Sequence, residues 1–181
     1  MEQSAKKNES SGQNDSGPVN IEKEIDELNT NSRQIVFFRT MIRTDIEMRK
    51  TLVNTLQNSG HNSDEYKKSV RDVEELDRNN ISRILGFYDK YGVPENQSAG
   101  RMQADAMWLI VSHNENIKVY RTLFPAFQKV WKKEYLEEAS FASYLQNFHR
   151  LVNGSRLEIK NPYRTPDEID ALLKALKGEL K

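Results

Sequence analysis

The sequence contains no cysteine, and this absence excludes disulfide bonds, thiolate metal ligands and cysteine nucleophiles. It does not fix the cellular compartment, because cytosolic and exported proteins can both lack cysteine. The three histidines, His61, His113 and His149, are scattered and do not recur at helical spacing. There is also no EF-hand-like loop. We therefore expect no metal site and no bound cofactor.

The chain also lacks an excess of charge of either sign, because 27 Lys and Arg residues balance 27 Asp and Glu residues. Nucleic-acid binding depends largely on Lys and Arg, so no nucleic-acid partner is expected. No apolar run approaches the roughly 20 residues of a transmembrane segment. The local basic group Lys129, Lys132 and Lys133 is interpreted as a solvated helix face.

Large aliphatic residues are almost absent from residues 1–20, where Val19 is the only one after Met1. This segment is rich in Ser, Asn, Gln, Gly and charge, and we predict a disordered tail or linker. No apolar signal-peptide region follows the start. Two interpretations stay open for the tail. It is either the start of a cytoplasmic protein, or the spacer of an extracytoplasmic lipoprotein, periplasmic or in the outer membrane, whose signal and anchoring cysteine have been removed.

Helical periodicity begins at residue 21 and predicts an all-α, single-domain bundle of five or six helices. The bundle is expected over residues 21–160, with a capped amphipathic helix in 161–181. Its first part reads as one long helix or two helices joined near residues 29–32. Asn20, Asn62 and Thr165 are expected to cap helices, and further helices are expected to begin at Ser98, at about Asn116 and at Ser140. The helix after Ser98 is apolar around most of its circumference and should be the central one, and Pro125 should kink the next helix or restart it.

A charged pair lies on the apolar stripe of the first long helix. Asp45 and Arg49 are four residues apart, so their side chains share one face and can pair directly. They lie among Ile42, Ile46 and Leu52, which predicts partial burial. Arg has five N–H donors, so partners from other helices are also expected. The pair is either a structural ion pair or one wall of a polar pocket.

Further polar and turn residues follow in two segments. The stretch LDRNNISRILGFYDKYGVP (76–94) contains Asp77, Asn80, Gly92 and Pro94, and AGRMQADAMWLIVSHNEN (99–116) contains Gly100, Trp108 and His113. With Asp45 and Arg49, these residues are similar in order and spacing to a bacterial family of small helical proteins catalogued only as a domain of unknown function. The resemblance covers residues 41–154, about 110 residues.

The sequence departs from that family in three places. The Gln that precedes the family's His is Ser112 here, and the family's Asp-Arg pair has Asn147 and Phe148 at the corresponding positions. The family's Tyr-Gly-Thr-Gln element is replaced by IKNPYRT. The resemblance therefore implies the helical fold more strongly than any activity, and it implies no substrate.

Two functions follow as hypotheses. The first is a non-enzymatic helical binding or protein-interaction module, a component of a larger bacterial envelope complex, that binds a protein partner through its first or last helix. The second is a small hydrolase-like enzyme. It would use His113, protonated by the helix dipole, and Asp77 as catalytic residues, with Asp45 or Asp105 as further carboxylate partners of His113. The pocket would be lined by Asp45, Arg49, Asn80 and Trp108.

Overall fold

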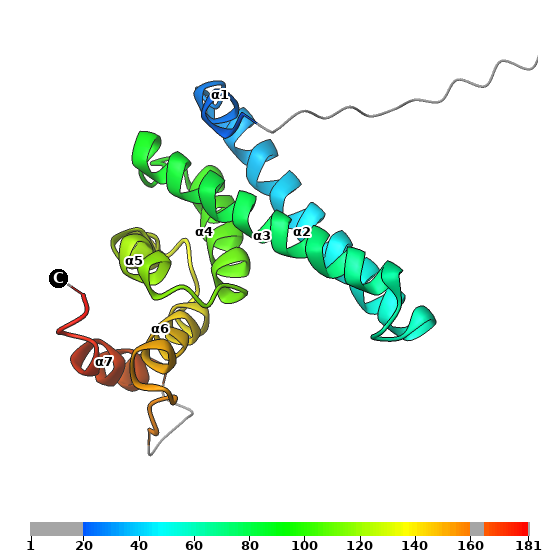
Figure 1. Cartoon of the computed structure of the whole chain (residues 1–181). Helices are drawn as coiled ribbons and strands as arrows, with labels where there is room; N and C mark the ends of the chain where they lie inside the picture. The colour runs from blue at the N-terminus through cyan, green and yellow to red at the C-terminus, as the bar shows by residue number, and fades with distance from the viewer. Residues whose placement is uncertain (1–19, 160–164, 181) are drawn as a thin grey trace, which may run out of the picture.

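The computed structural model describes residues 20–159 and 165–180, and every regular element in these ranges is a helix (Figure 1). The predicted all-α class is therefore confirmed. The predicted tail lies outside the described residues, apart from Asn20. In chain order the helices are α1 (Ile21–Asp26), α2 (Asn31–Ser59), α3 (Asp64–Tyr91), α4 (Gln97–Ser112), α5 (Ile117–Lys132), α6 (Glu138–Asn153) and α7 (Thr165–Ala175).

The first predicted helix is divided into α1 and α2. Asn20 caps α1 by accepting from the Lys23 amide at 3.0 Å. Thr30 is extended, with φ −132° and ψ 150°, and its hydroxyl accepts from the Arg33 amide at 3.3 Å. This new cap restarts the chain as α2. The break at residues 27–30 turns α1 back so that it packs against α3.

Several other helix starts differ from the prediction by a few residues. Ser63, rather than Asn62, accepts from the Tyr66 amide and caps α3. Asn96 caps α4 two residues before the predicted Ser98. Asn116 caps α5, so this helix begins close to its predicted start. Asn, Asp and Ser offer similar side-chain acceptors, so a sequence that contains several in a row does not identify which one caps.

The course and the starts of the last three helices can be compared with the signals at Pro125, Ser140 and Thr165. α5 continues through Pro125, which is exposed, so that water can reach the carbonyl left without its amide partner. α6 begins after Glu137, which makes no side-chain cap, rather than at Ser140. α7 begins at Thr165 itself.

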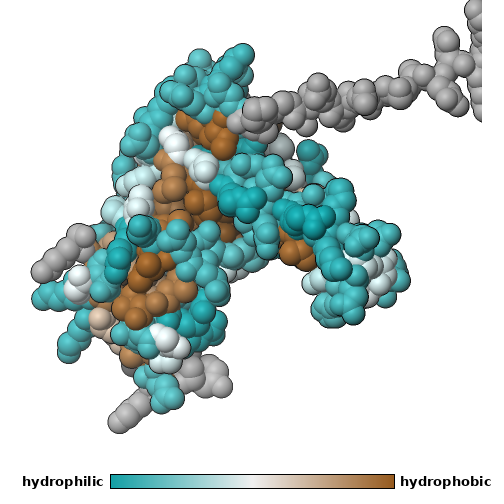
Figure 2. Space-filling model, viewed as in Figure 1, coloured by the Kyte–Doolittle hydropathy of each residue, from teal (hydrophilic) through white to brown (hydrophobic). Residues whose placement is uncertain are grey.

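The helices form a long pair with a second group packed on one half of it. α2 and α3 pack side by side, and their far ends project beyond the remaining helices (Figure 1). α4 contacts α2, α3, α5 and α6, and α7 packs on α6. The projecting end is mostly hydrophilic in the view of Figure 2. Within the described ranges, no helix has the length and apolar character needed to cross a membrane.

The core is aromatic and aliphatic, and α4 is the central helix as predicted. The last helix packs part of its apolar stripe into the bundle, because Ile169, Leu172 and Leu176 are 1%, 0% and 0% exposed. A partner bound through the first or last helix stays a prediction. The largest fully buried side chains are Tyr120, Phe38, Phe87, Phe127, Phe141, Phe148, Ile84, Met107, Ile110, Leu123, Leu145 and Ile169.

Candidate functional site

A polar cluster occupies the space between α2, α3 and α4. Asp45 on α2 is 0% exposed, and the guanidinium of Arg49 pairs with it. Arg49 Nε donates to both carboxylate oxygens at 3.3 and 3.1 Å, and Nη2 donates to Oδ1 at 3.2 Å. The predicted inward direction of this pair is confirmed. Ile46, expected on the same stripe, is instead 54% exposed, because it lies about 100° around the helix from Asp45.

Two other helices complete the cluster. Arg49 Nη2 also donates to Asp77 Oδ1 on α3, so one guanidinium bridges the two carboxylates. His113, the residue that ends α4, places Nδ1 3.7 Å from Asp45 Oδ2. The structure therefore brings Asp45, Arg49, Asp77 and His113 together, although they lie up to 68 residues apart in the sequence.

Burial shifts the pKa values of two members of the cluster, Asp77 and His113. Desolvation raises the pKa of Asp77, with Arg49 opposing this shift and Asp45 reinforcing it. Desolvation lowers the pKa of His113 below 6.5, and the Arg49 charge adds to this effect against the two carboxylates. A protonated His113 stabilised by the helix dipole was expected, and the direction is the reverse. The neutral imidazole is therefore favoured at neutral pH.

A neutral imidazole beside two carboxylates can accept a proton or bind a metal ion. One donor atom each from Asp45, Asp77 and His113 lies within 4.8 Å of the others, and this is the one such group within the described residues. These are oxygen and nitrogen ligands of the kind that Zn²⁺ accepts. The Arg49 guanidinium, however, already bridges the two carboxylates. The Arg49 charge therefore offsets one of the two carboxylate charges, and a metal ion would have to displace Arg49 from Asp77.

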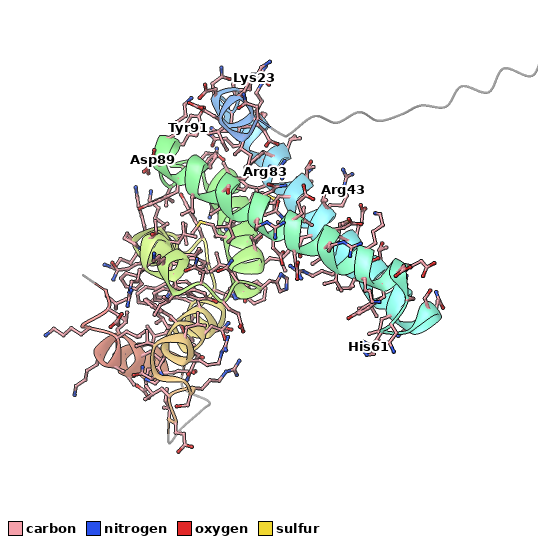
Figure 3. All side chains as sticks on the ribbon, in the orientation of Figure 1. Lys23, Arg43, His61, Arg83, Asp89 and Tyr91 are labelled. Atoms are coloured by element: carbon pink, nitrogen blue, oxygen red, sulfur yellow. The ribbon has the colours of Figure 1, made fainter. Side chains whose placement is uncertain are left out.

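The other predicted pocket residues lie elsewhere. Trp108 and Asp105 line a separate cavity next to Trp131 and Tyr135, so neither belongs to the cluster. His149 is buried and its Nδ1 lies 2.9 Å from the Ser155 carbonyl oxygen. His61 lies at the turn between α2 and α3, at the projecting end (Figure 3).

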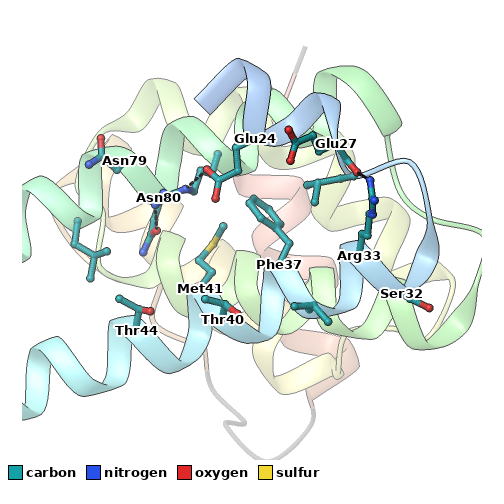
Figure 4. A pocket seen from close by; sticks show the side chains of 14 residues that line it. Glu24, Glu27, Ser32, Arg33, Phe37, Thr40, Met41, Thr44, Asn79 and Asn80 are labelled. Carbon is teal, nitrogen blue, oxygen red and sulfur yellow. Dashed lines mark hydrogen bonds and ion pairs between the residues drawn. The ribbon is translucent and has the colours of Figure 1, made fainter. Parts of the chain in front are cut away.

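A groove of about 820 Å³ lies between α1, α2 and α3. Leu28, Phe37 and Met41 form an apolar floor, and they are 7%, 9% and 5% exposed. Val36 also lines the groove and is 60% exposed. The polar lining residues surround this floor (Figure 4). They are Glu24, Glu27, Ser32, Arg33, Thr40, Thr44, Asn79, Asn80 and Arg83.

Both arginines of the groove already donate hydrogen bonds to other groups of the protein. Arg83 Nε donates to Glu24 Oε2 at 2.8 Å and thereby joins α3 to α1. Arg33 Nη1 donates to the Glu27 backbone carbonyl at 2.8 Å. Asn80, predicted to line a pocket with Asp45, lines this groove instead and accepts from Arg83 Nη1 at 3.3 Å.

The cluster and the groove are neighbours along the same two helices. Met41 of the groove precedes Asp45 by one helical turn on α2, and Asn80 of the groove follows Asp77 by three residues on α3. The Arg49 bridge therefore ties α2 to α3 at the end of the groove, next to the lining residues Thr44 and Leu76. The groove could not be predicted from the sequence, because it is assembled from three helices whose packing no local pattern specifies.

Comparison with protein-family models finds no match to this chain. Searches of curated proteins and of solved structures also find no match. The resemblance to the helical family stays a prediction, and the geometry of the cluster and the groove is the basis for the proposals that follow.

Proposed function

We propose that this protein is a helical binding module whose α1–α2–α3 groove receives apolar side chains of a partner protein. The observation that carries this proposal is Val36, which is 60% exposed beside an apolar floor in a groove of about 820 Å³. Concave sites with an apolar floor and a few polar groups are the usual form of binding sites. The volume is in the range of a small ligand and suits a short segment of a partner chain with a few anchoring side chains.

The position of the groove agrees with a partner that binds the first part of the chain rather than the last. α7 has no free apolar face, since Ile169, Leu172 and Leu176 are buried. The large exposed apolar residues of the described ranges, Val36, Ile46 and Val53, all lie on α2. Of these three residues only Val36 lines the groove, so the proposal assigns recognition to Val36 and the floor beside it.

Selection of displayed random peptides on the folded protein tests this assignment. We expect enrichment of peptides with two or more large apolar residues, and fluorescence anisotropy gives their Kd. Val36→Glu should weaken binding at least about tenfold, because a charge enters the apolar contact. Ile46→Glu is the matched control, since Ile46 is 54% exposed on the same helix outside the groove. It should change Kd less than about twofold.

Two outcomes would contradict the proposal. Selection that enriches no peptide would remove the evidence for a binding groove. Equal loss of affinity in both variants would show that α2 binds peptides through general hydrophobicity rather than through the groove.

A small hydrolase-like enzyme is the second candidate, favoured by the convergence of His113, Asp45 and Asp77. The pKa of His113 is lowered by burial, so the imidazole is available as a base at neutral pH. The side chains of His113 and Asp77 are 29% and 25% exposed, which leaves the cluster accessible from solvent. A water molecule activated there would attack a carbonyl or phosphoryl group.

Hydrolysis of carboxylate and phosphate p-nitrophenyl esters tests this candidate. An activity that depends on the cluster should fall about 100-fold or more in His113→Gln, the range for losing a general base. His61→Gln provides the matched control at the remote turn (Figure 3). Activity that is equal in all three proteins would reject the enzyme.

A further inference from the structure

The buried end of the groove contains an amide donor with nothing to bind. Asn80 is 1% exposed, and its Nδ2 has no hydrogen-bond partner among the described residues. Figure 4 shows Asn80 reaching from α3 toward the side of the groove formed by Met41 and Thr44 of α2. An unpaired buried N–H group costs free energy comparable to a lost hydrogen bond.

The neighbouring arginine fixes which end of the amide is free. Arg83 Nη1 donates to Asn80 Oδ1 at 3.3 Å. Arginine has donors and no acceptor, so the atom facing Arg83 must be the carbonyl oxygen. The two N–H groups of Nδ2 are therefore turned away from Arg83, and a rotation of the amide would place donor against donor.

We propose that Asn80 is the polar anchor of the groove and that it donates to an uncharged acceptor, a free peptide carbonyl, of the bound segment. This inference rests on the proposed binding function and adds the chemistry of the occupant. The acceptor enters beside an apolar side chain that packs on Met41 and Phe37. Because Asn80 is 1% exposed, small side-chain shifts admit the acceptor and then shield the bond from water.

The charges at this end of the groove favour a neutral acceptor over a carboxylate. Arg83 is paired with Glu24 at 2.8 Å, so its charge is already balanced. A ligand carboxylate would lie near Glu24 without an uncommitted cation to offset the repulsion and the loss of solvation.

The free carbonyl also restricts the backbone of the occupant. Inside an α-helix each carbonyl already accepts from the amide four residues later, so carbonyls without such a bond are the better acceptors for Asn80. Only the last turn of a helix, or an extended segment, presents free carbonyls. The occupant is therefore an apolar segment in extended form or at a helix C-terminus.

Nuclear magnetic resonance with two small probes tests this chemistry. N-acetyl-L-leucine methylamide offers a neutral carbonyl beside an apolar side chain, and N-acetyl-L-leucine carries a carboxylate instead of the second amide. The Asn80 side-chain NH₂ signals are assigned by their absence in Asn80→Asp, which keeps an oxygen for Arg83 but replaces the donor by an acceptor.

We expect the methylamide to shift the Asn80 NH₂ signals together with the Val36 methyl signals, and to bind more tightly than the carboxylate. Asn80→Asp should weaken methylamide binding about fivefold or more, and Asn80→Leu, which removes the donor without adding charge, should also weaken it. Thermal unfolding of both variants establishes that they are folded at the temperature of the titration.

The remaining outcomes overturn the proposal in distinguishable ways. If Val36 and Met41 methyl signals move while Asn80 does not, or both variants bind like the original protein, the groove binds apolar groups without this anchor and the proposed function stands. Tighter binding of the carboxylate rejects the neutral acceptor. If no groove signal moves up to the solubility limit of either probe, the anchor and the groove are both rejected.

Discussion

The Asp45–Arg49 pair allows the sharpest test of what the polar cluster does for the fold. Replacing Arg49 by Met removes the guanidinium that contacts Asp45 and Asp77 and leaves a carboxylate at 0% exposure without its partner. Breaking a fully buried ion pair costs about 3–5 kcal/mol. The Arg49 side chain is 27% exposed, so solvent screening reduces the cost. We expect the free energy of unfolding to fall by about 2–3 kcal/mol.

A double-mutant cycle isolates the pair from other effects of the substitution. Asp45→Asn leaves Arg49 its second partner, Asp77, and should cost about 1–2 kcal/mol. In the double variant no charge is left unpaired at position 45, so the loss should be smaller than the sum of the single losses by about 1–2 kcal/mol.

Urea unfolding followed by circular dichroism at 222 nm measures the free energy of unfolding of the original protein, the two single variants and the double variant. The loss expected for Arg49→Met corresponds to a fall in Tm of about 5–10 °C. Lys68→Met is the control, because its partner Asp72 is 39% exposed, and such pairs contribute about 0–1 kcal/mol. Additive losses would refute the coupling that the bidentate geometry implies.

Three further predictions concern single positions. The pKa of His113 should lie below 6.5, because burial and the Arg49 charge disfavour the imidazolium. The free energy of unfolding should therefore fall as the pH falls from above 6.5 through the lowered pKa. Titration by ¹H NMR measures this pKa, and Arg49→Met should raise it. Gly100→Ala should cost about 1–3 kcal/mol in urea unfolding, because a Cβ there overlaps the Tyr135 ring, and a loss below about 0.5 kcal/mol would show that the ring moves freely. Leu172→Ala should cost about 2–5 kcal/mol because Leu172 is 0% exposed between α7 and α6, and an unchanged Tm would contradict that packing.

Local patterns predicted the helices well and their mutual arrangement poorly. The i, i+4 spacing of Asp45 and Arg49 specifies one face of one helix, so their pairing could be predicted. That Asp77 meets the same guanidinium depends on how α3 lies against α2, and no spacing within either helix contains that information. The same limit explains Trp108, whose helix was identified correctly but whose side chain lines a different cavity from the one predicted.

The groove shows the same limit, because an exposed apolar residue on one helix does not by itself indicate a groove. Val36 and Ile46 have comparable exposure, 60% and 54%, and both appear in the sequence as apolar residues of an amphipathic helix. Only the break before Thr30, which lets α1 pack against α3, makes one of them part of a groove. The cap at Thr30 is therefore as important for the groove as any residue that lines it.

The position of the cluster suggests how a structural ion pair and a binding groove depend on each other. Arg49 joins α2 to α3 through Asp77, three residues before Asn80, and Arg83 joins α3 to α1 beside Asn80. Both bridges lie near the end of the groove at Asn80, so they hold α1, α2 and α3 together there before any ligand arrives. A preformed site loses less conformational entropy on binding. Arg49→Met should therefore weaken peptide binding although Arg49 does not line the groove, whereas a purely catalytic role for the cluster leaves peptide affinity unchanged.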